Sequence, residues 1–140
     1  FPQAMKEAGI PLKYDRLRIT EYINDMDVCL AAADLVVCRS GASTLAELEA
    51  AGKASILIPS PIVAGNHQYH NAMVLGKAGA AIVIEQKDAS NERIISEIEK
   101  LSSAPAKVAS MGEAAGALHL SDTNERILAV IDKLIAKGKK

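Results

Sequence analysis

The chain has 140 residues; 49% of them are hydrophobic, 24% are charged and 3% are aromatic, and the formal net charge is −1. These values are typical of a globular protein large enough for one domain with its own core, and the near-neutral charge argues against nucleic-acid binding. No apolar run approaches the ~20 residues of a membrane span. The 2 cysteines and 3 histidines show no metal-ligand spacing, so we expect no metal and no cofactor.

The apolar pattern alternates between short β-branched runs and longer amphipathic segments. The short runs predict strands at residues 17–22, 35–38, 55–58 and 81–84. The segments between them predict helices at residues 26–33, 43–51 and 68–78. Asn24 or Asp25 is a candidate N-cap of the first helix, and Gly52 and Gly79 are expected to end the other two.

The last third of the chain predicts helices with no strand between them, at residues 90–101, 104–118 and 121–137. Arg93 and Glu97 have the spacing of a solvated helix face. The last helix carries an apolar stripe that is typical of a core or of a docking face. The stripe comprises Ile127, Leu128, Ile131, Leu134 and Ile135.

The β–α–β–α–β order predicts an α/β fold with a doubly wound parallel sheet, because short loops require right-handed crossovers. Ligands of such sheets bind at the carboxyl ends of the strands. We expect three of these ends to converge on one cleft: the turn after Tyr22, the turn at Gly41 and the loop at residues 59–66.

The most informative stretch is the apolar strand that stops at Gly41 and is followed by small hydroxyl residues and a helix. A helix N-terminus presents unpaired N–H groups and the positive end of the dipole, so it can bind a phosphate. Glu47, about one turn further in, is placed to bind the hydroxyls of an attached ribose. The alternative is a structural turn, since most strand–glycine–helix turns bind nothing. Arg39 likewise has two interpretations, which are diphosphate binding and an ion pair with an acidic neighbour.

Neutral polar side chains open the third helix. Asn66, Gln68 and Asn71 offer paired donors and acceptors without charge, which suits polyols such as sugars. The alternative is that Asn66 caps the helix while Gln68 and Asn71 are solvated. We expect no catalytic role for His67 or His70, because no orienting carboxylate or nucleophile lies beside them in the sequence.

Five motifs in order carry a resemblance to a known family. They are Tyr22-Ile23-Asn24-Asp25-Met26, the run from Ala33 to Thr44, Glu47 with Ala50-Ala51-Gly52, the run from Pro59 to Ala72, and Lys77-Ala78-Gly79-Ala80-Ala81. Together they resemble the carboxyl-terminal domain of the MurG family, the bacterial peptidoglycan N-acetylglucosaminyltransferases, over about residues 22–86. The resemblance implies an incomplete, Rossmann-like C-terminal half of a GT-B glycosyltransferase, in which residues 1–140 are a single donor-binding domain without the N-terminal acceptor-binding domain.

The resemblance also implies a UDP-N-acetylglucosamine site. The backbone of Ile23 would bind the uracil, Met26 would pack near the nucleotide, and Glu47 would bind the ribose hydroxyls. Gln68 would bind the sugar hydroxyls, and Asn71 would support the sugar pocket. The diphosphate would be held by Ala42, Ser43 and Thr44, in a donor site that also includes Arg39, Ser40, Gly41 and His67.

The reaction implied by the resemblance is transfer of N-acetylglucosamine to lipid I, which forms lipid II with inversion at the anomeric carbon. The acceptor domain, the general base and the membrane-contacting surface are expected outside this chain. No catalytic residue is therefore assigned within it, and we expect it to be inactive alone. We expect the chain in the cytoplasm and the full-length enzyme on the cytoplasmic face of the inner membrane.

Two alternatives to this function stay open. One is another GT-B nucleotide-sugar enzyme, either a glycosyltransferase or a UDP-sugar epimerase. The other is a non-catalytic donor-binding subunit of a split glycosyltransferase.

The resemblance also predicts an open sheet edge. The family's first donor-domain strands are absent from the chain, and they would separate residues 17–22 from residues 35–38. A hydrophobic edge left this way invites pairing. We expect either a rearranged sheet in which these two strands pair directly or an edge-paired homodimer.

Overall fold

The computed structural model describes residues 7, 9, 13–14 and 17–138, and the chain divides into two compact units, Phe1–Ala32 and Ala33–Lys140. Each unit is described by itself. The first contains the short strands β1 (Lys13–Tyr14) and β2 (Leu17–Arg18) and the helix α2 (Met26–Ala32).

The first unit differs from the strand predicted at residues 17–22. Only Leu17 and Arg18 are in β2, which pairs antiparallel with β1. A strand forms only where a neighbouring strand hydrogen-bonds its N–H and C=O groups. In the described residues β1 pairs with Leu17 and Arg18 alone. Direct pairing of this segment with residues 35–38, one of the two expected arrangements, is not found among the described residues, because β2 and β3 belong to different sheets.

The second unit contains the predicted β–α–β–α–β segment, with bounds within two residues of those expected. Its elements are β3 (Leu35–Cys38), α3 (Ala42–Ala51), β4 (Ala54–Leu57), the 3₁₀ turn η1 (Ala64–Asn66), α4 (His67–Lys77), β5 (Ala81–Val83), the 3₁₀ turn η2 (Gln86–Asp88), α5 (Asn91–Ser102), α6 (Pro105–Gly116) and α7 (Thr123–Gly138). Gly52 and Gly79 end α3 and α4 with positive φ angles of 59° and 77°, a conformation that favours glycine.

The sheet of this unit has the order β3-β4-β5, and both pairings are parallel. The register places Leu35 beside Ala54 and Ser55 beside Ala81. All three strands therefore end at the same edge, where the connections to α3, α4 and η2 begin. The predicted parallel sheet is confirmed, and this edge is where a ligand of such a fold binds.

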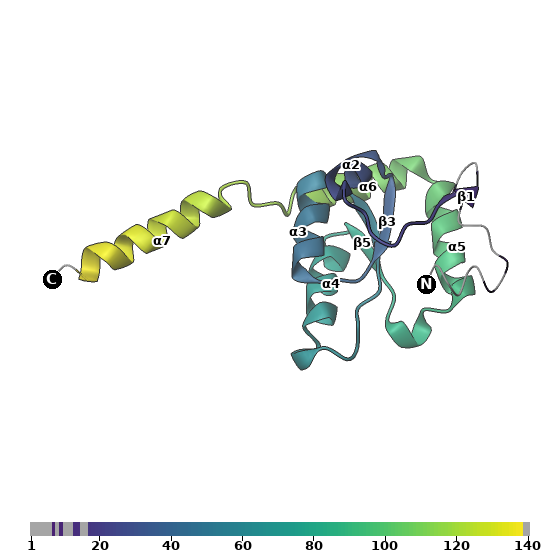
Figure 1. Cartoon of the computed structure of the whole chain (residues 1–140), viewed down its shortest axis with the longest axis horizontal. Helices are drawn as coiled ribbons and strands as arrows, with labels where there is room; N and C mark the ends of the chain where they lie inside the picture. Colours follow the sequence, from purple (N-terminus) through teal and green to yellow (C-terminus); the bar gives the residue numbers. More distant parts are fainter. Residues whose placement is uncertain (1–6, 8, 10–12, 15–16, 139–140) are drawn as a thin grey trace. The chain divides into compact units, whose positions relative to one another are not determined.

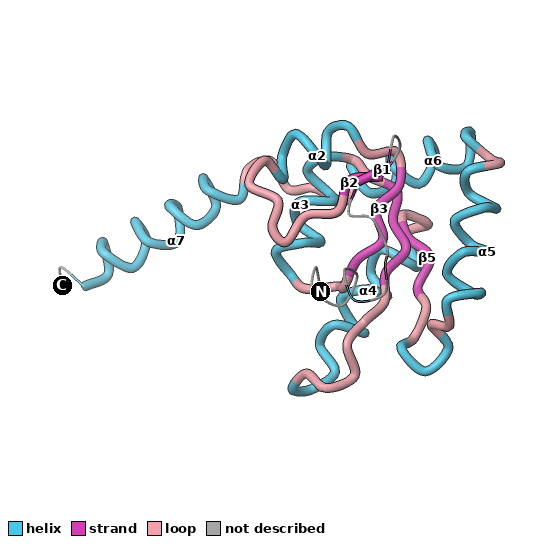
Figure 2. The backbone as a smooth tube through the Cα atoms, turned by 45° about the vertical axis from the view of Figure 1, so that its right-hand side comes forward, coloured by secondary structure: helices cyan, strands magenta, loops and turns pink. Residues whose placement is uncertain are grey.

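Helices cover both faces of the sheet. Figures 1 and 2 show α3 and α4 on one side of the strands and α5 on the other. The main core cluster joins the sheet to α5 and α6, and its buried members are Ala54, Ile56, Ile84, Leu101 and Met111. Alternate residues of a strand point to opposite faces, and Ser55 and Leu57 are buried as well, so β4 is covered on both sides. This is the doubly wound arrangement.

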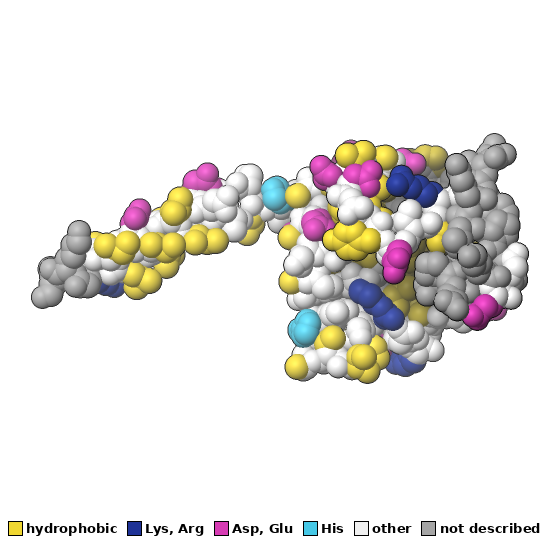
Figure 3. Space-filling view, viewed as in Figure 1, with side chains coloured by type: hydrophobic (Ala, Val, Ile, Leu, Met, Phe, Trp, Pro, Cys, Tyr) yellow, Lys and Arg dark blue, Asp and Glu magenta, His cyan; other side chains and the backbone are white. Residues whose placement is uncertain are grey.

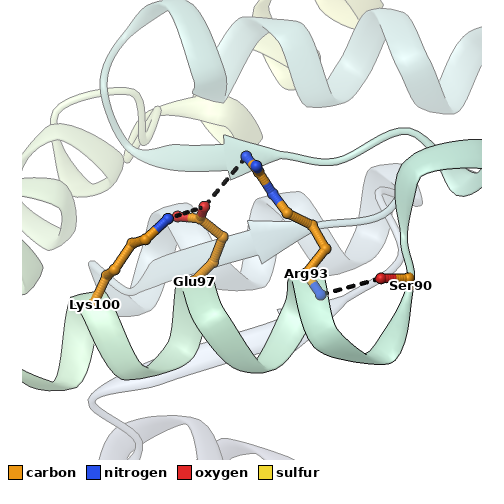
Figure 4. Close-up of polar contacts among 4 residues, drawn as sticks. All are labelled: Ser90, Arg93, Glu97 and Lys100. Atoms are coloured by element: carbon orange, nitrogen blue, oxygen red, sulfur yellow. Dashed lines mark hydrogen bonds and ion pairs between the residues drawn. The ribbon is translucent and has the colours of Figure 1, made fainter.

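One face of α5 departs from the sequence-based expectation. Ser90 caps the helix by accepting a hydrogen bond from the N–H of Arg93. Glu97, expected on a solvated face, is only 7% exposed, and its carboxylate lies 3.2 Å from Arg93 Nη2 and 2.9 Å from Lys100 Nζ (Figure 4). These neighbours, the Lys100 hydrogen bond foremost, lower the pKa of Glu97 against the opposing effect of burial.

The predicted stripe of α7 is not part of the described core. The large apolar side chains of this helix are 44% to 64% exposed, and Figure 3 shows them running along it in yellow. Within the described residues, no helix is long and apolar enough to cross a membrane.

Candidate functional site

The turn from β3 to α3 leaves a helix N-terminus open at the carboxyl edge of the sheet. Gly41 is the N-cap in an extended conformation, and its carbonyl accepts the first helical hydrogen bond, from the N–H of Leu45 at 3.0 Å. No side chain caps α3 and its first turn contains no acidic residue. The N–H groups of Ala42, Ser43 and Thr44 are therefore available, and the first two of these residues are exposed. An anion would be stabilised here by these donors and by the helix dipole.

Glu47 lies on α3, three residues after Thr44 and four after Ser43, and so on the same side of the helix. Its side chain is exposed. In the described part of the chain it has no hydrogen bond or ion pair. A free carboxylate one turn from an anion site offers two acceptor oxygens to neighbouring hydroxyl groups.

Arg39 connects the ends of two strands. Its Nη1 donates to the carbonyl of Ile58 at 3.0 Å and, at 3.5 Å, to that of Pro59. The predicted alternative of an ion pair with an acidic neighbour is wrong, because main-chain carbonyls are its partners among the described residues. The side chain is exposed, so its positive charge remains accessible to solvent beside the β3–α3 turn.

Ser40 is fully buried, with 0% exposure, and its Oγ donates to the main-chain carbonyl of Gln68 at 2.8 Å. The β3–α3 turn is thereby joined to the start of α4. The side chain of Gln68 makes a further connection, since its Oε1 accepts from the N–H of Ser60 at 2.9 Å. Three segments that are separate in the sequence meet at this point.

The start of α4 does not have the side-chain cap that was the alternative interpretation of Asn66. Asn66 occupies the N-cap position with a φ of 51°, and its side chain makes no capping hydrogen bond. A capping side chain normally requires an extended backbone at this position, whereas Asn66, the last residue of η1, has a left-handed backbone. Next to it, His67 Nδ1 lies 2.9 Å from the carbonyl of Ala64, and the ring is exposed.

Asn71 and Ala42, the first residue of α3, line the same groove. The groove has a volume of about 210 Å³ and runs between α3 and α4, where Asn71, Ala42 and Glu49 are among its lining residues. Asn71 is half-buried and lies one turn after Gln68 on α4. Glu47 is not among the lining residues of this groove.

Two predicted site residues belong to the first unit. Ile23 precedes α2 and Met26 is its first residue, with exposures of 38% and 42%. Asp25 occupies the predicted N-cap position, where its carbonyl accepts from the N–H of Cys29 at 3.0 Å.

Sequence reasoning missed the partners that hold the predicted residues in place. The N–H of Ser60 and the carbonyls of Ile58 and Pro59 are main-chain groups, and no side-chain pattern marks them. The Pro59-Ser60-Pro61 run could have indicated a rigid loop, because two prolines restrict the backbone.

A cavity larger than this groove lies elsewhere among the described residues. It has a volume of about 860 Å³ and is lined by the first residues of β3 and β4, Leu35 and Ala54, together with residues of α5 and α6 such as Leu101 and Gly112. It is thus at the amino ends of the strands, opposite the carboxyl edge. The open α3 N-terminus and the converging polar groups place the candidate site at the carboxyl edge instead.

The chain is similar to known glycosyltransferases in sequence and in structure. The glycosyltransferase family 28 C-terminal domain matches residues 3–127. The chain is 49% identical over 114 residues to a protein of Sorangium cellulosum (strain So ce56), and 41% identical over 139 residues to one of Desulforudis audaxviator (strain MP104C). Both are named UDP-N-acetylglucosamine--N-acetylmuramyl-(pentapeptide) pyrophosphoryl-undecaprenol N-acetylglucosamine transferase.

These matches cover 81% and 99% of this chain but only 28% and 37% of the two relatives. Among solved structures, MurG of Acinetobacter baumannii superposes with a TM-score of 0.76 at 26% identity, over 84% of this chain and 35% of that one. The spinosyn forosaminyltransferase SpnP superposes with a TM-score of 0.69 at 16% identity, over 91% and 31% of the two chains, which shows a shared fold.

Proposed function

The chain belongs to the glycosyltransferase family 28 C-terminal domains. We propose that it is the donor-binding part of an N-acetylglucosaminyltransferase of peptidoglycan synthesis. Its donor is UDP-N-acetylglucosamine, and the acceptor of the whole enzyme is lipid I. The observation that carries the proposal is the uncapped N-terminus of α3 with the unpaired Glu47 one turn along it. The identity to transferases of this name supports the choice of donor.

The proposed diphosphate site is the first turn of α3. The N–H groups of Ala42, Ser43 and Thr44 donate to phosphate oxygens, and Arg39 adds a positive charge nearby. Transfer of the sugar breaks its bond to the diphosphate, so negative charge increases on the UDP that leaves. Donors fixed in advance by the fold stabilise that charge without having to reorganise, which favours the reaction.

The proposed ribose and sugar sites flank the diphosphate. Glu47 accepts hydrogen bonds from the ribose hydroxyls, and Gln68 binds a hydroxyl of the N-acetylglucosamine. Asn71, which lines a groove with Ala42, supports the sugar side. The contacts of Ile23 and Met26 with the nucleotide stay a prediction from the sequence.

The acceptor half of the reaction is proposed to lie outside this chain. The chain spans 28% and 37% of the two relatives, which leaves most of their length for lipid I recognition and the general base. An acceptor attached to undecaprenol is a membrane lipid, whereas a nucleotide sugar is a soluble metabolite. We propose that the whole enzyme acts at the cytoplasmic face of the membrane, where the two meet.

Nucleotide titration tests the donor site. The chain is titrated with UDP, UDP-glucose and UDP-N-acetylglucosamine, using chemical-shift changes that detect millimolar binding. Glu47→Ala is expected to weaken all three ligands by about three- to tenfold, because each loses hydrogen bonds from its ribose hydroxyls to a charged group. Glu99→Ala, on the exposed face of α5, is the matched control and is expected to bind as the parent does.

Two results would contradict this proposal. Equal binding by Glu47→Ala and the parent chain removes Glu47 from the site. A parent chain that binds none of the three nucleotides at millimolar concentration rejects the donor site altogether.

A further inference from the structure

Ser40 occupies a place in the fold that no ligand can reach directly. It is 0% exposed, and its Oγ donates to the carbonyl of Gln68 at 2.8 Å. In an α-helix that carbonyl also accepts from the N–H of residue 72, and a carbonyl oxygen has two lone pairs. The Ser40 hydroxyl thus takes the second lone pair and attaches the first turn of α4 to the end of β3. Its buried position is suited to holding another residue rather than to touching substrate.

The residue so held has a determined amide orientation. Gln68 Oε1 lies 2.9 Å from the backbone nitrogen of Ser60. A backbone N–H can only donate, so the side-chain atom facing it must be the oxygen rather than the nitrogen. The Nε2 group of Gln68 therefore points to the other side. This group has no hydrogen-bond partner among the described residues. It is also not one of the buried side-chain atoms that lack a partner, so it is in contact with solvent.

We infer that Ser40 is a positioning residue that, together with the Ser60 N–H, holds the Gln68 carboxamide with its oxygen toward Ser60, so that its N–H donors face the ligand. This inference rests on the proposed function and deepens it, because it specifies what Gln68 recognises. The recognised group is a hydrogen-bond acceptor on the sugar, namely a hydroxyl oxygen. A nucleotide sugar that lacks this hydroxyl oxygen leaves the amide donors unpaired and binds less tightly than UDP-N-acetylglucosamine.

The three residues connect the specificity of the site to the fold. Ser40 belongs to the β3–α3 turn that holds the diphosphate in the proposed function, and Ser60 belongs to the loop after β4. Gln68 is in the first turn of α4 and contacts both. Loss of the Ser40 hydroxyl is expected to shift the start of α4 relative to the Ser60 loop, which weakens sugar binding and leaves the nucleotide contacts in place.

The test measures the hydrogen bond and the binding separately. The scalar coupling across the hydrogen bond from Ser60 N–H to the Gln68 side-chain carbonyl is measured by NMR in the whole chain. In the same samples, the dissociation constants of UDP and UDP-N-acetylglucosamine are measured. The ratio of the two constants reports the sugar contribution alone, because changes at the nucleotide affect both ligands equally.

Ser40→Ala is expected to lose or weaken the coupling and to reduce the sugar contribution by about three- to tenfold, the range of one hydrogen bond. Gln68→Glu retains an oxygen for Ser60 but has no donor. It is expected to keep the coupling while the sugar contribution falls by about three- to tenfold. Ser103→Ala removes a matched 2.8 Å bond, from Ser103 Oγ to the Glu99 carbonyl on α5, and is expected to change neither quantity.

Each contrary outcome has a distinct meaning. An unchanged sugar contribution in Ser40→Ala overturns the positioning role even if the parent chain binds both nucleotides as proposed. A parent chain that binds neither nucleotide contradicts the proposed function, and persistence of the coupling in Ser40→Ala then overturns the positioning role as well. If Ser40→Ala does not fold, Ser40→Cys replaces the hydroxyl with a weak donor of similar size, and the same two measurements decide.

Discussion

Gly112 on α6 approaches the main chain of Gly52 so closely that a Cβ on Gly112 would lie 2.5 Å from the Gly52 carbonyl oxygen. It would also lie 3.5 Å from the Gly52 carbonyl carbon and 3.9 Å from the Ala54 nitrogen. All of these are backbone atoms, which cannot move aside as a flexible side chain can. The helix that covers one face of the sheet is thus packed directly on the turn that ends α3, at the opposite end of that helix from the candidate diphosphate site.

Gly112→Ala is therefore expected to destabilise the fold by about 1–3 kcal/mol, the usual cost of overpacking. The change is measured as a shift of the urea midpoint. Gly116→Ala is the matched control on the same helix, because its Cβ would meet Gly52 Cα at 3.8 Å, an ordinary contact. This control is expected to be neutral or to gain up to about 1 kcal/mol from helix propensity. Similar midpoints for the two variants would contradict the close packing.

Ser55, in the middle strand of the sheet, carries the buried side-chain oxygen without a hydrogen-bond partner among the described residues. A desolvated hydroxyl that is not hydrogen-bonded costs about 1–3 kcal/mol. Ser55→Ala is expected to stabilise the chain by roughly 1 kcal/mol in urea unfolding, because it removes that cost. The void left by one oxygen atom is small and offsets little of this gain. Ser110→Ala, which removes an exposed hydroxyl that donates to the Lys107 carbonyl at 2.9 Å, should leave the midpoint nearly unchanged. A destabilised Ser55→Ala would show that this hydroxyl is hydrogen-bonded in solution.

The ion pairs of Glu97 predict a pH dependence of stability. The pKa of Glu97 is lowered in the folded chain, first by the hydrogen bond from Lys100 and then by the charges of Lys100 and Arg93. A lowered folded-state pKa means that the unfolded chain binds the proton more readily. Glu97 therefore stabilises the fold above its ordinary pKa, and this contribution is lost as the pH falls through the folded-state value.

The loss of stability is measured by urea unfolding at about pH 7, 5, 4 and 3, values that span the pH range in which carboxyl groups titrate. The parent chain is expected to lose stability more steeply on acidification than Glu97→Gln, which has no charge to lose. Glu99→Gln, on the exposed side of the same helix, is expected to follow the parent chain. Parallel curves for the parent and Glu97→Gln would rule out a contribution from these ion pairs.

The charge of Arg39 is expected to act on the diphosphate. Arg39→Ala should weaken UDP and UDP-N-acetylglucosamine by the same factor, about three- to tenfold, and should leave uridine binding unchanged because uridine has no phosphate. Chemical-shift titration of the three ligands measures this. Weaker uridine binding would show instead that Arg39 acts through the loop whose carbonyls it holds at Ile58 and Pro59.

The free edge of β3 predicts association of the chain. In the described part, β3 pairs with β4 and has no strand on its other side. Its Val37 side chain is 41% exposed. An unpaired apolar edge favours pairing with a second copy, so we propose an edge-paired homodimer. Sedimentation analysis is expected to show a concentration-dependent dimer that Val37→Lys weakens, and a monodisperse parent monomer would contradict it.

Much of the second unit could be predicted from local patterns. Apolar runs and the positions of Gly52 and Gly79 located the strands and the helix ends, because period and left-handed termini are local properties. The prediction of a strand at residues 17–22 is wrong beyond Arg18, because a strand also depends on a second strand that pairs with it, and the segment's own sequence does not contain that partner. Glu97 was placed on a solvated face for a similar reason, because helical spacing reports which residues align but not what covers them.

For the candidate site, the sequence by itself determined the chemical types and their order: a glycine that opens a helix, a carboxylate one turn later and an amide at the start of the next helix. These follow from spacing along one chain. Only the tertiary structure decided how the groups are used. Ser40 is buried and bonded to the first turn of α4, Arg39 bonds to carbonyls rather than to a carboxylate, and the side-chain oxygen of Gln68 accepts from the Ser60 N–H. The physical reason is that each of these outcomes depends on a main-chain group from another segment, and main-chain groups are the same in every residue until the fold places them.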